Sequence, residues 1–183
     1  NIYSAVFNKS DARWSEPVVI ADRLKTGAEL NRYIKKIGNP VLVMDSKSRI
    51  WLFYVTVSIG GWSGSSISFR ISDAQGKSWS PAKRLITSPL INISTLVKGR
   101  PVMFDNGLIG LPVYHEQFWE FAEFLIIDEN GRVRDKRRIT HRKKAIQPWL
   151  VPVDKHQAVT LMRTVGKNVR NVLYSRTKDN GMH

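Results

Sequence analysis

The stretch ISDAQGKSWSP at residues 71–81 decides the fold, because a related stretch, NKSDARWSEP, occurs at residues 8–17. Each is a short polar turn that ends in Trp-Ser with a proline close behind. A degenerate third copy is IIDENGRVRDK at residues 126–136, and a fourth begins with SRTKDNGMH at residues 175–183. Successive copies lie about 65, 52 and 50 residues apart, the size of a four-stranded propeller blade rather than of a helical solenoid repeat. The sequence therefore predicts a repeated β unit.

Short β-type runs fill the space between these copies. Runs rich in β-branched and aromatic residues, separated by turn residues, predict an all-β fold. The Asn-Gly turns at residues 105–107 and 128–131 predict two tight hairpins. Residues 26–37 fit either a short helix or an irregular loop. The predicted strands cover residues 40–44, 50–57, 66–71, 101–104, 108–114, 120–127, 132–139, 149–153, 158–163 and 171–176.

The composition favours one packed domain. The chain has 183 residues, of which 42% are hydrophobic and 24% charged. No apolar run approaches the roughly 20 residues of a membrane-spanning helix. Without cysteine there are no disulfides, thiolate zinc sites or cysteine nucleophiles. The four histidines lack the spacing of a zinc site, so we assign no metal. The compartment stays open.

A strong basic excess is the second feature of the composition. Lys and Arg number 29 against 15 Asp and Glu, a net charge of +14, and half of the excess lies in residues 132–144. This segment is either a charged strand edge or a groove for a polyanion. It has no interleaved aromatic residue, and the chain shows no known DNA- or RNA-binding motif, so nucleic acid is not the expected partner.

The turn at residues 72–79 resembles the Asp box, whose pattern is Ser/Thr-x-Asp-x-Gly-x-Thr-Trp. In this pattern the carboxylate caps the hairpin, the glycine takes a left-handed conformation and the aromatic ring packs between strands. Ala74 stands where the pattern has Asp, with Asp73 displaced by one, which predicts a worn copy. The matching positions are Ser72, Gly76, Ser78 and Trp79 in this copy and Thr177, Asp179 and Gly181 in the last one.

An ordered series of further segments resembles the BNR-repeat sialidase-like family, also described as predicted neuraminidases. The resemblance implies a six-bladed β-propeller, to which residues 1–183 contribute three to four blades as a partial domain. The chain is then expected to be a piece of a longer one that self-associates or pairs with the missing half. The segments are GNPVL at residues 38–42, RIWLFY at 49–54, GRPV at 99–102, IQP at 146–148 and LMRT at 161–164.

The resemblance also implies a set of catalytic groups. Sialidases use a neutral Tyr nucleophile deprotonated by a Glu, an Asp acid/base and three Arg that hold the sugar carboxylate. They need no metal or organic cofactor, so the resemblance implies none for this chain. Tyr114 and Glu116, at the end of a predicted strand, have the residue types of the nucleophile and its base. Otherwise they line the pocket, or they are a strand aromatic and a loop carboxylate. Asp45, Asp105 and Asp128 all fall in turns, where capping explains them, so no acid/base Asp is assigned.

Five residues are candidates for binding the substrate. Arg163 ends an apolar strand and Arg100 lies in Gly-Arg-Pro; each is a carboxylate ligand or a surface ion-pair residue. Asn39 and Gln147 each precede a proline at a predicted strand start, where an amide suits sugar hydroxyls or turn capping. Trp62 lies in a Gly-Ser loop and suits stacking on a sugar.

These features predict a sialidase-like exo-glycoside hydrolase that acts on terminal, sialic acid type sugars of glycans. The alternative is a non-catalytic propeller that binds a glycan or polyanion, and a third possibility is a protein-interaction scaffold. Catalytic activity itself is left open, because a fold does not establish a function. The aromatic residues at 118, 119 and 121 could stack on a sugar, but those at 119 and 121 are expected in core strand packing.

Overall fold

The computed structural model describes residues 1–117, 119–140, 144–154, 157–166 and 171–177. Within these ranges the chain is all-β, as its sequence predicts, with one α-helix, α1 (Arg23–Glu29), and a 3-10 turn, η1 (Trp62–Gly64). The strands are β1 (Ile2–Ser4), β2 (Phe7–Asn8), β3 (Arg13–Trp14), β4 (Val18–Ala21), β5 (Lys36–Met44), β6 (Ile50–Val57), β7 (Ser65–Ser72), β8 (Lys83–Arg84), β9 (Leu96–Val97), β10 (Val102–Met103), β11 (Ile109–His115), β12 (Phe121–Ile127), β13 (Val133–Arg138), β14 (Ala145–Pro152), β15 (Ala158–Thr164) and β16 (Val172–Thr177).

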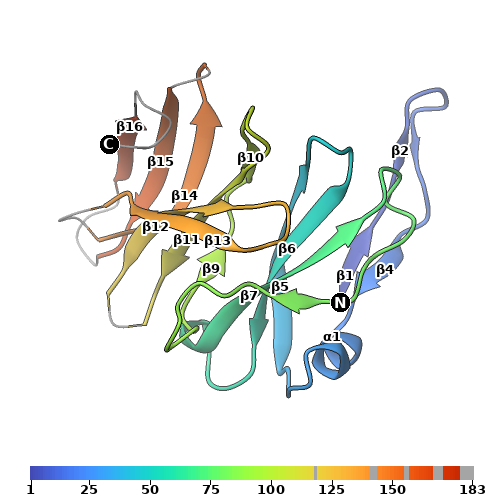
Figure 1. The fold of residues 1–183 in the computed structure, drawn as a ribbon, viewed down its shortest axis with the longest axis horizontal. Helices are drawn as coiled ribbons and strands as arrows, with labels where there is room; N and C mark the ends of the chain where they lie inside the picture. The colour runs from blue at the N-terminus through green and yellow to red at the C-terminus, as the bar shows by residue number, and fades with distance from the viewer. Residues whose placement is uncertain (118, 141–143, 155–156, 167–170, 178–183) are drawn as a thin grey trace.

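The strands form separate antiparallel sheets arranged side by side, like blades of a propeller (Figure 1). The central sheet has the order β5-β6-β7-β8. The five-stranded sheet has the order β10-β11-β12-β13, with β9 also paired to β11. The three-stranded sheet has the order β14-β15-β16, while β1 pairs with β4 and β2 with β3. In the central sheet, in the three-stranded sheet and along the path from β10 to β13, neighbouring strands are also consecutive in sequence, so these parts are antiparallel meanders. The pairs β1–β4 and β9–β11 join strands that are not consecutive.

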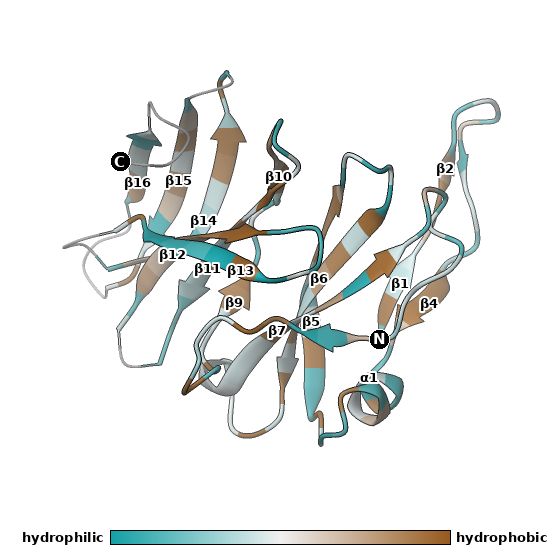
Figure 2. Cartoon of the chain, in the orientation of Figure 1, coloured by the Kyte–Doolittle hydropathy of each residue, from teal (hydrophilic) through white to brown (hydrophobic). Residues whose placement is uncertain are grey.

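The main hydrophobic core lies between the central and the five-stranded sheets. The Trp51 ring stacks on Phe69, with 5.3 Å between centroids, and Phe53 lies beside both. Buried residues of the five-stranded sheet, such as Leu111 and Leu125, belong to the same cluster. Figure 2 shows hydrophobic residues on inner strands such as β6 and β12 and hydrophilic ones along β13. Packing of one sheet against the next therefore holds the array together.

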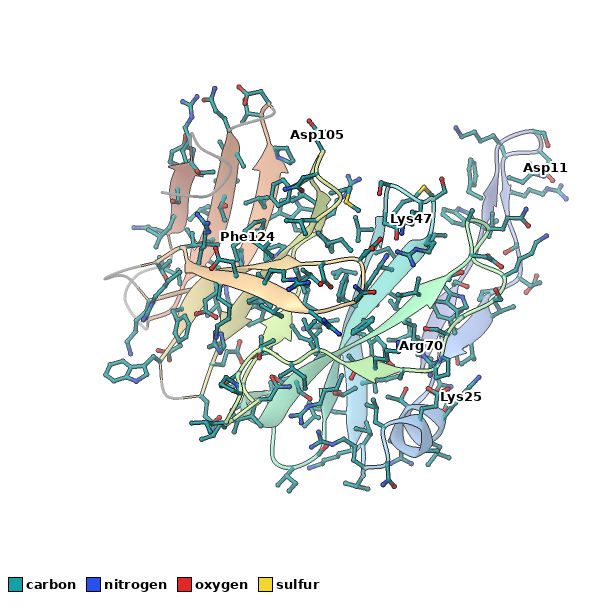
Figure 3. The ribbon with its side chains drawn as sticks, viewed as in Figure 1. Asp11, Lys25, Lys47, Arg70, Asp105 and Phe124 are labelled. Atoms are coloured by element: carbon teal, nitrogen blue, oxygen red, sulfur yellow. The ribbon has the colours of Figure 1, made fainter. Side chains whose placement is uncertain are left out.

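Two of the three turn aspartates cap their hairpins, as the sequence predicts. Asp45 Oδ1 accepts the backbone N–H groups of Lys47 and Arg49, each at 2.9 Å. Asp128 Oδ1 accepts two backbone N–H groups in the same way, also at 2.9 Å. Asp105 is exposed and points away from the sheets at the tip of the β10–β11 hairpin (Figure 3). The predicted hairpins at residues 105–107 and 128–131 are both present.

Two repeated turns, each containing a Trp-Ser pair, share one hydrogen-bond pattern. The Ser80 N–H donates to Ile71 O at 2.8 Å, and the Ile71 N–H donates to Ser80 Oγ at 3.0 Å. Ser15 and Val6 form the same two bonds at 2.8 and 3.0 Å. The sequence repeat thus has a structural counterpart. We call these segments the first and second Trp turns, residues 6–15 and 71–80.

Asp73 caps the second Trp turn. Its carboxylate accepts the N–H groups of Gln75, Lys77 and Ser78 at 3.1, 3.0 and 3.2 Å, and the Ser78 hydroxyl at 2.7 Å. The sequence predicted a worn turn, because Ala74 stands where the pattern has Asp. That expectation is wrong as far as the cap is concerned, since the Asp73 carboxylate supplies it from one position earlier. Whether this turn is an Asp box in the strict sense stays a prediction.

Three sequence-based expectations need correction. The helix spans Arg23–Glu29 and not residues 26–37, because Asp22 caps it and Leu30 ends it. Trp119, expected in the core, is 70% exposed, since it lies in the loop that follows β11. The strands β5 and β14 each begin four residues before the predicted starts at residues 40 and 149. The last difference bears directly on the candidate site.

Candidate functional site

The sequence predicted that Asn39 and Gln147 lie at strand starts. In the structure both residues lie inside strands, Asn39 in β5 and Gln147 in β14. The register of β5 shifts between Gly38 and Val41, and that of β14 shifts between Ile146 and Trp149. At these bulges Asn39 has φ 50° and Gln147 has φ 56°, in the left-handed region that residues other than glycine seldom adopt. The proline that follows each residue has no N–H for the ladder, so a bulge accommodates it. The bulges re-aim the two amide side chains.

The five-stranded sheet carries a third interruption of this kind. Both β9 and β10 pair with β11, on the side that β12 leaves free, and residues 98–101 separate them. This segment contains Arg100-Pro101, which matches the residue-proline pairs of the other two bulges. A Cβ on Gly99 would lie 2.0 Å from Pro148 O, so only glycine permits this approach. The bulges of neighbouring sheets are thus packed against one another.

Tyr114, at the end of β11, is the centre of the candidate site. Burial raises the pKa of its hydroxyl, and the negative charge of Glu116 raises it further. The nearby side-chain amides of Gln147 and Asn39 and the positive charge of Arg163 lower this pKa in part. The structure therefore brings together five of the residues singled out in the sequence, from three different sheets and the loop after β11. A neutral, buried phenol surrounded by amides and charges of both signs suits a polar ligand.

Backbone contacts position Glu116 beside this tyrosine. The N–H groups of Glu116 and Gln117 donate to Ser94 Oγ at 3.3 and 3.0 Å. Ser94 itself has φ 63°. A residue of the loop between the central and five-stranded sheets thus fixes where the β11–β12 loop begins. Sequence reasoning missed Ser94, because nothing in its local sequence signals a contact 22 residues away.

Trp62 lies beside the first bulge. A Cβ on Gly38 would be 3.1 Å from Trp62 Cη2, so the indole covers the glycine that precedes Asn39. Lys36 Nζ lies 4.0 Å from the centroid of the Trp62 ring, a cation–π contact that the sequence did not indicate. The ring is 37% exposed and leaves part of its surface open to a ligand.

The remaining candidates are less closely tied to this centre. Arg100 is exposed, and its nearness to the site follows from the contact between Gly99 and Pro148. Asp179 and Gly181, of the last predicted turn, lie outside the described residues. Among the described residues no group of three or more Asp, Glu or His side chains could hold a metal ion. No helix in the described part of the chain is long and apolar enough to cross a membrane.

Comparison with known proteins places the chain in a family. The fold and the repeated turns define an all-β, propeller-like protein. The chain belongs to the family of the BNR repeat-like domain, whose model matches residues 1–183, and this confirms the resemblance seen in the sequence. No curated protein matches the sequence.

Several solved structures are similar in fold. The Hadza microbial sialidase Hz136 has a TM-score of 0.69 at 15% identity, over 92% of this chain and 37% of its own. A Dyadobacter fermentans protein of unknown function has a TM-score of 0.70 at 17% identity, over 95% and 54%. The endo-1,5-alpha-L-arabinanase of Thermotoga petrophila has a TM-score of 0.59 at 16% identity, over 87% and 41%. The chain thus spans about half the length of these structures or less.

Proposed function

We propose that this chain is part of a sialidase-like exo-glycoside hydrolase whose pocket around Tyr114 binds the terminal, anionic sugar of a glycan. The observation that carries the proposal is the convergence of Glu116, Arg163, Asn39 and Gln147 on the buried Tyr114 hydroxyl. Similar folds in proteins described as a sialidase and an arabinanase support a role in glycan chemistry. Sialic acid as the sugar follows from the residue types and not from these names.

The residue types suit an anionic sugar. A carboxylate nucleophile would be repelled by the sugar carboxylate, whereas the neutral Tyr114 hydroxyl is not. As its oxygen attacks the anomeric carbon, the proton passes to Glu116, which lowers the barrier that the raised pKa of Tyr114 would otherwise impose. Arg163 and Arg100 present guanidinium forks to the sugar carboxylate. In the same displacement the bond from the anomeric carbon to the leaving-group oxygen breaks, and that oxygen takes a proton from an acid/base Asp, the group that the family resemblance implies.

Binding of hydroxyl and amide groups on the sugar falls to the bulges. Asn39 and Gln147 each present a donor and an acceptor, and their bulged backbone holds them toward Tyr114. Trp62 supplies a flat apolar surface beside Asn39 on which a sugar ring can stack. These contacts are the same whether the bound sugar is hydrolysed or only held.

A glycan-binding propeller without catalysis is the second candidate. Burial and Glu116 keep the Tyr114 hydroxyl protonated at neutral pH, and the side-chain amides of Asn39 and Gln147 lie near it. This arrangement serves equally well as a polar contact for a ligand. It favours binding without turnover if no acid/base group completes the pocket.

The test is hydrolysis of fluorogenic α-sialosides and other glycosides by the parent protein and its Tyr114→Phe and Arg163→Leu variants. We expect Arg163→Leu to lower kcat/KM by about 100-fold, the effect of losing a charge-assisted hydrogen bond to the sugar carboxylate. Arg176→Leu, on the same sheet, is the matched control and should keep its activity. Sugar binding without turnover across the panel would favour the second candidate, and neither binding nor turnover would reject both.

A further inference from the structure

Three loops at one edge of the sheets expose large apolar side chains. Leu90 is 92% exposed, Ile59 82%, and Ile91 and Tyr33 67% each. Residues of this kind usually lie in the core or against a partner. These four occupy loop tips and not the faces of sheets, so stacking of a further sheet would not cover them. We call the loops at residues 30–36, 58–64 and 86–95 together the apolar edge.

Hydrogen bonds join these loops into one continuous edge. The Lys35 N–H donates to Val57 O at 2.7 Å, which ties the first loop to the start of the second. Ser65 Oγ donates to Thr95 O at 3.1 Å, which ties the end of the second loop to the third. Figure 1 shows α1, the β6–β7 loop and the connection that leads to β9 along the lower side of the molecule. The exposed apolar residues therefore belong to one surface.

The third loop is rigidly braced although its apolar side chains are exposed. Asn92 Oδ1 accepts the N–H and hydroxyl of Thr87 at 2.9 and 2.6 Å, and its Nδ2 donates to Leu85 O at 2.8 Å. Arg84 donates to the carbonyl of Asn92. The backbone is thus fixed around one asparagine. A loop held in this way presents Leu90 and Ile91 as a constant feature of the surface.

The charge of the apolar edge is purely positive. Its three loops contain Arg32, Lys35 and Lys36 and no Asp or Glu. Burial lowers the pKa of Arg84, at the base of the third loop, and the nearby positive charge of Arg32 lowers it further. The net charge of the whole chain is +14. Apolar tips flanked by basic residues are the pattern of proteins that dock on a membrane surface rich in anionic lipid.

We propose that the apolar edge docks on a lipid bilayer that carries anionic headgroups. Leu90, Ile91 and Ile59 enter the boundary between headgroups and acyl chains, and Arg32 and Lys35 contact the lipid phosphates. A lipid surface fits better than a protein groove, because the apolar side chains stand on three separate loops and the only charges in these loops, on Arg32, Lys35 and Lys36, are positive. Trp62 lies on the same edge, so docking would also turn the candidate pocket toward the membrane. The proposal does not depend on the chemistry of that pocket.

Co-sedimentation with vesicles tests this inference. We expect the protein to bind vesicles of phosphatidylcholine mixed with phosphatidylserine, more weakly as salt rises, and to bind phosphatidylcholine alone poorly. A Leu90→Ser/Ile91→Ser variant should bind at least about 10-fold more weakly, because each buried methylene contributes to insertion. Arg32→Gln/Lys35→Gln should remove the preference for anionic lipid.

The matched control is Met44→Ser/Val153→Ser, which removes two exposed apolar side chains, one at the last residue of β5 and one just after β14, and should bind as before. Circular dichroism confirms that all variants fold. Absence of vesicle binding, or unchanged binding by the Leu90 and Ile91 variant, would overturn the proposal. So would a self-associated protein that this variant converts to monomers, since the occupant would then be a second copy. Arg163→Leu should leave vesicle binding intact, which separates this test from that of the glycan pocket.

Discussion

The first and second Trp turns share a backbone frame but differ in what fills it. In both turns a serine closes the turn by two hydrogen bonds to the residue nine positions before it, Ser15 to Val6 and Ser80 to Ile71. In the second turn, Asp73 accepts three backbone N–H groups and a hydroxyl. At the matching position of the first turn, Asn8 accepts only the N–H and hydroxyl of Ser10, at 3.1 and 2.9 Å.

The two tryptophans differ in the same sense. Trp79 packs against a buried cluster that includes Leu52 and Tyr54, and its Nε1 donates to Gly76 O at 3.1 Å. Trp14 is 68% exposed and contacts Phe7, with 5.2 Å between ring centroids. The short motif therefore specifies the path of the backbone, whereas the neighbouring sheet determines how strongly each copy is anchored. Four predictions test this distinction.

Replacement of Arg70 should have the largest effect. Its side chain is 1% exposed, lies between β7 and α1 (Figure 3), pairs with Glu29 and donates to Ser80 O at 2.9 Å. Ala5 occupies the matching position before the first turn. Arg70→Met would leave Glu29 without its cation and should lower the free energy of unfolding by about 3 kcal/mol in urea denaturation.

Arg13→Met, at an exposed site in the first turn, is the control for this change. It should alter the free energy of unfolding by less than about 0.5 kcal/mol. Equal effects of the two substitutions would show that the second turn is no better anchored than the first.

Truncation of the tryptophans should give the next largest difference. Trp79→Ala removes a half-buried ring from the cluster around Leu52 and should cost about 2 kcal/mol. Trp14→Ala removes an exposed ring and should cost less than about 0.5 kcal/mol. Thermal unfolding of both variants measures the contrast. A large loss from Trp14→Ala would mean that the first turn has packing partners that its exposure does not reveal.

The left-handed residue of each turn provides a reciprocal test. Gly76 has φ 70° in the second turn, and Ala12 has φ 55° in the first. Gly76→Ala should destabilise the protein by about 1 kcal/mol, because a Cβ is strained in this region. Ala12→Gly should relieve the same strain and leave stability unchanged or raise it by up to about 1 kcal/mol. Urea denaturation of both variants gives the two signs, and equal signs would argue against strain at Ala12.

The sequence predicts the strands well where they are regular. The span of β6 is predicted to the residue, and β7, β12 and β15 to within one residue at each end. The errors at β5 and β14 share one physical cause. A proline read locally marks a strand start, but here each proline lies in a bulge that the strand continues through. Strands of two residues, such as β8 and β9, leave no periodic signal at all.

The candidate site illustrates a second limit. Tyr114, Glu116 and Arg163 could be chosen by residue type and by their place at strand ends. That Asn39 and Gln147 reach the same hydroxyl from two other sheets depends on their left-handed backbone. The residue-proline pairs at residues 39–40, 100–101 and 147–148 are a second repeat in the sequence and indicate this arrangement. The repeat of the Trp turns does not include these pairs and so does not predict it.

The smallest expected effect is the pH dependence contributed by Asp73. The hydrogen bond from the Ser78 hydroxyl, followed by that from the Lys77 N–H, lowers the pKa of its carboxyl from 3.8 to about 2. Because the folded pKa lies below the unfolded one, the carboxylate stabilises the fold above pH 3.8 and loses this contribution as the pH falls toward 2. Asp73→Asn should therefore reduce the loss of stability across this window, seen as a flatter dependence of the urea midpoint on pH.

Asn8→Asp should make the dependence of the urea midpoint on pH slightly steeper, because the first turn offers fewer donors. Asp11→Asn is the control, since the single N–H that Asp11 accepts is 3.4 Å away. An unchanged profile in Asp73→Asn would mean that the exposed cap contributes nothing that solvent does not replace, and that packing around Trp79 alone distinguishes the two turns.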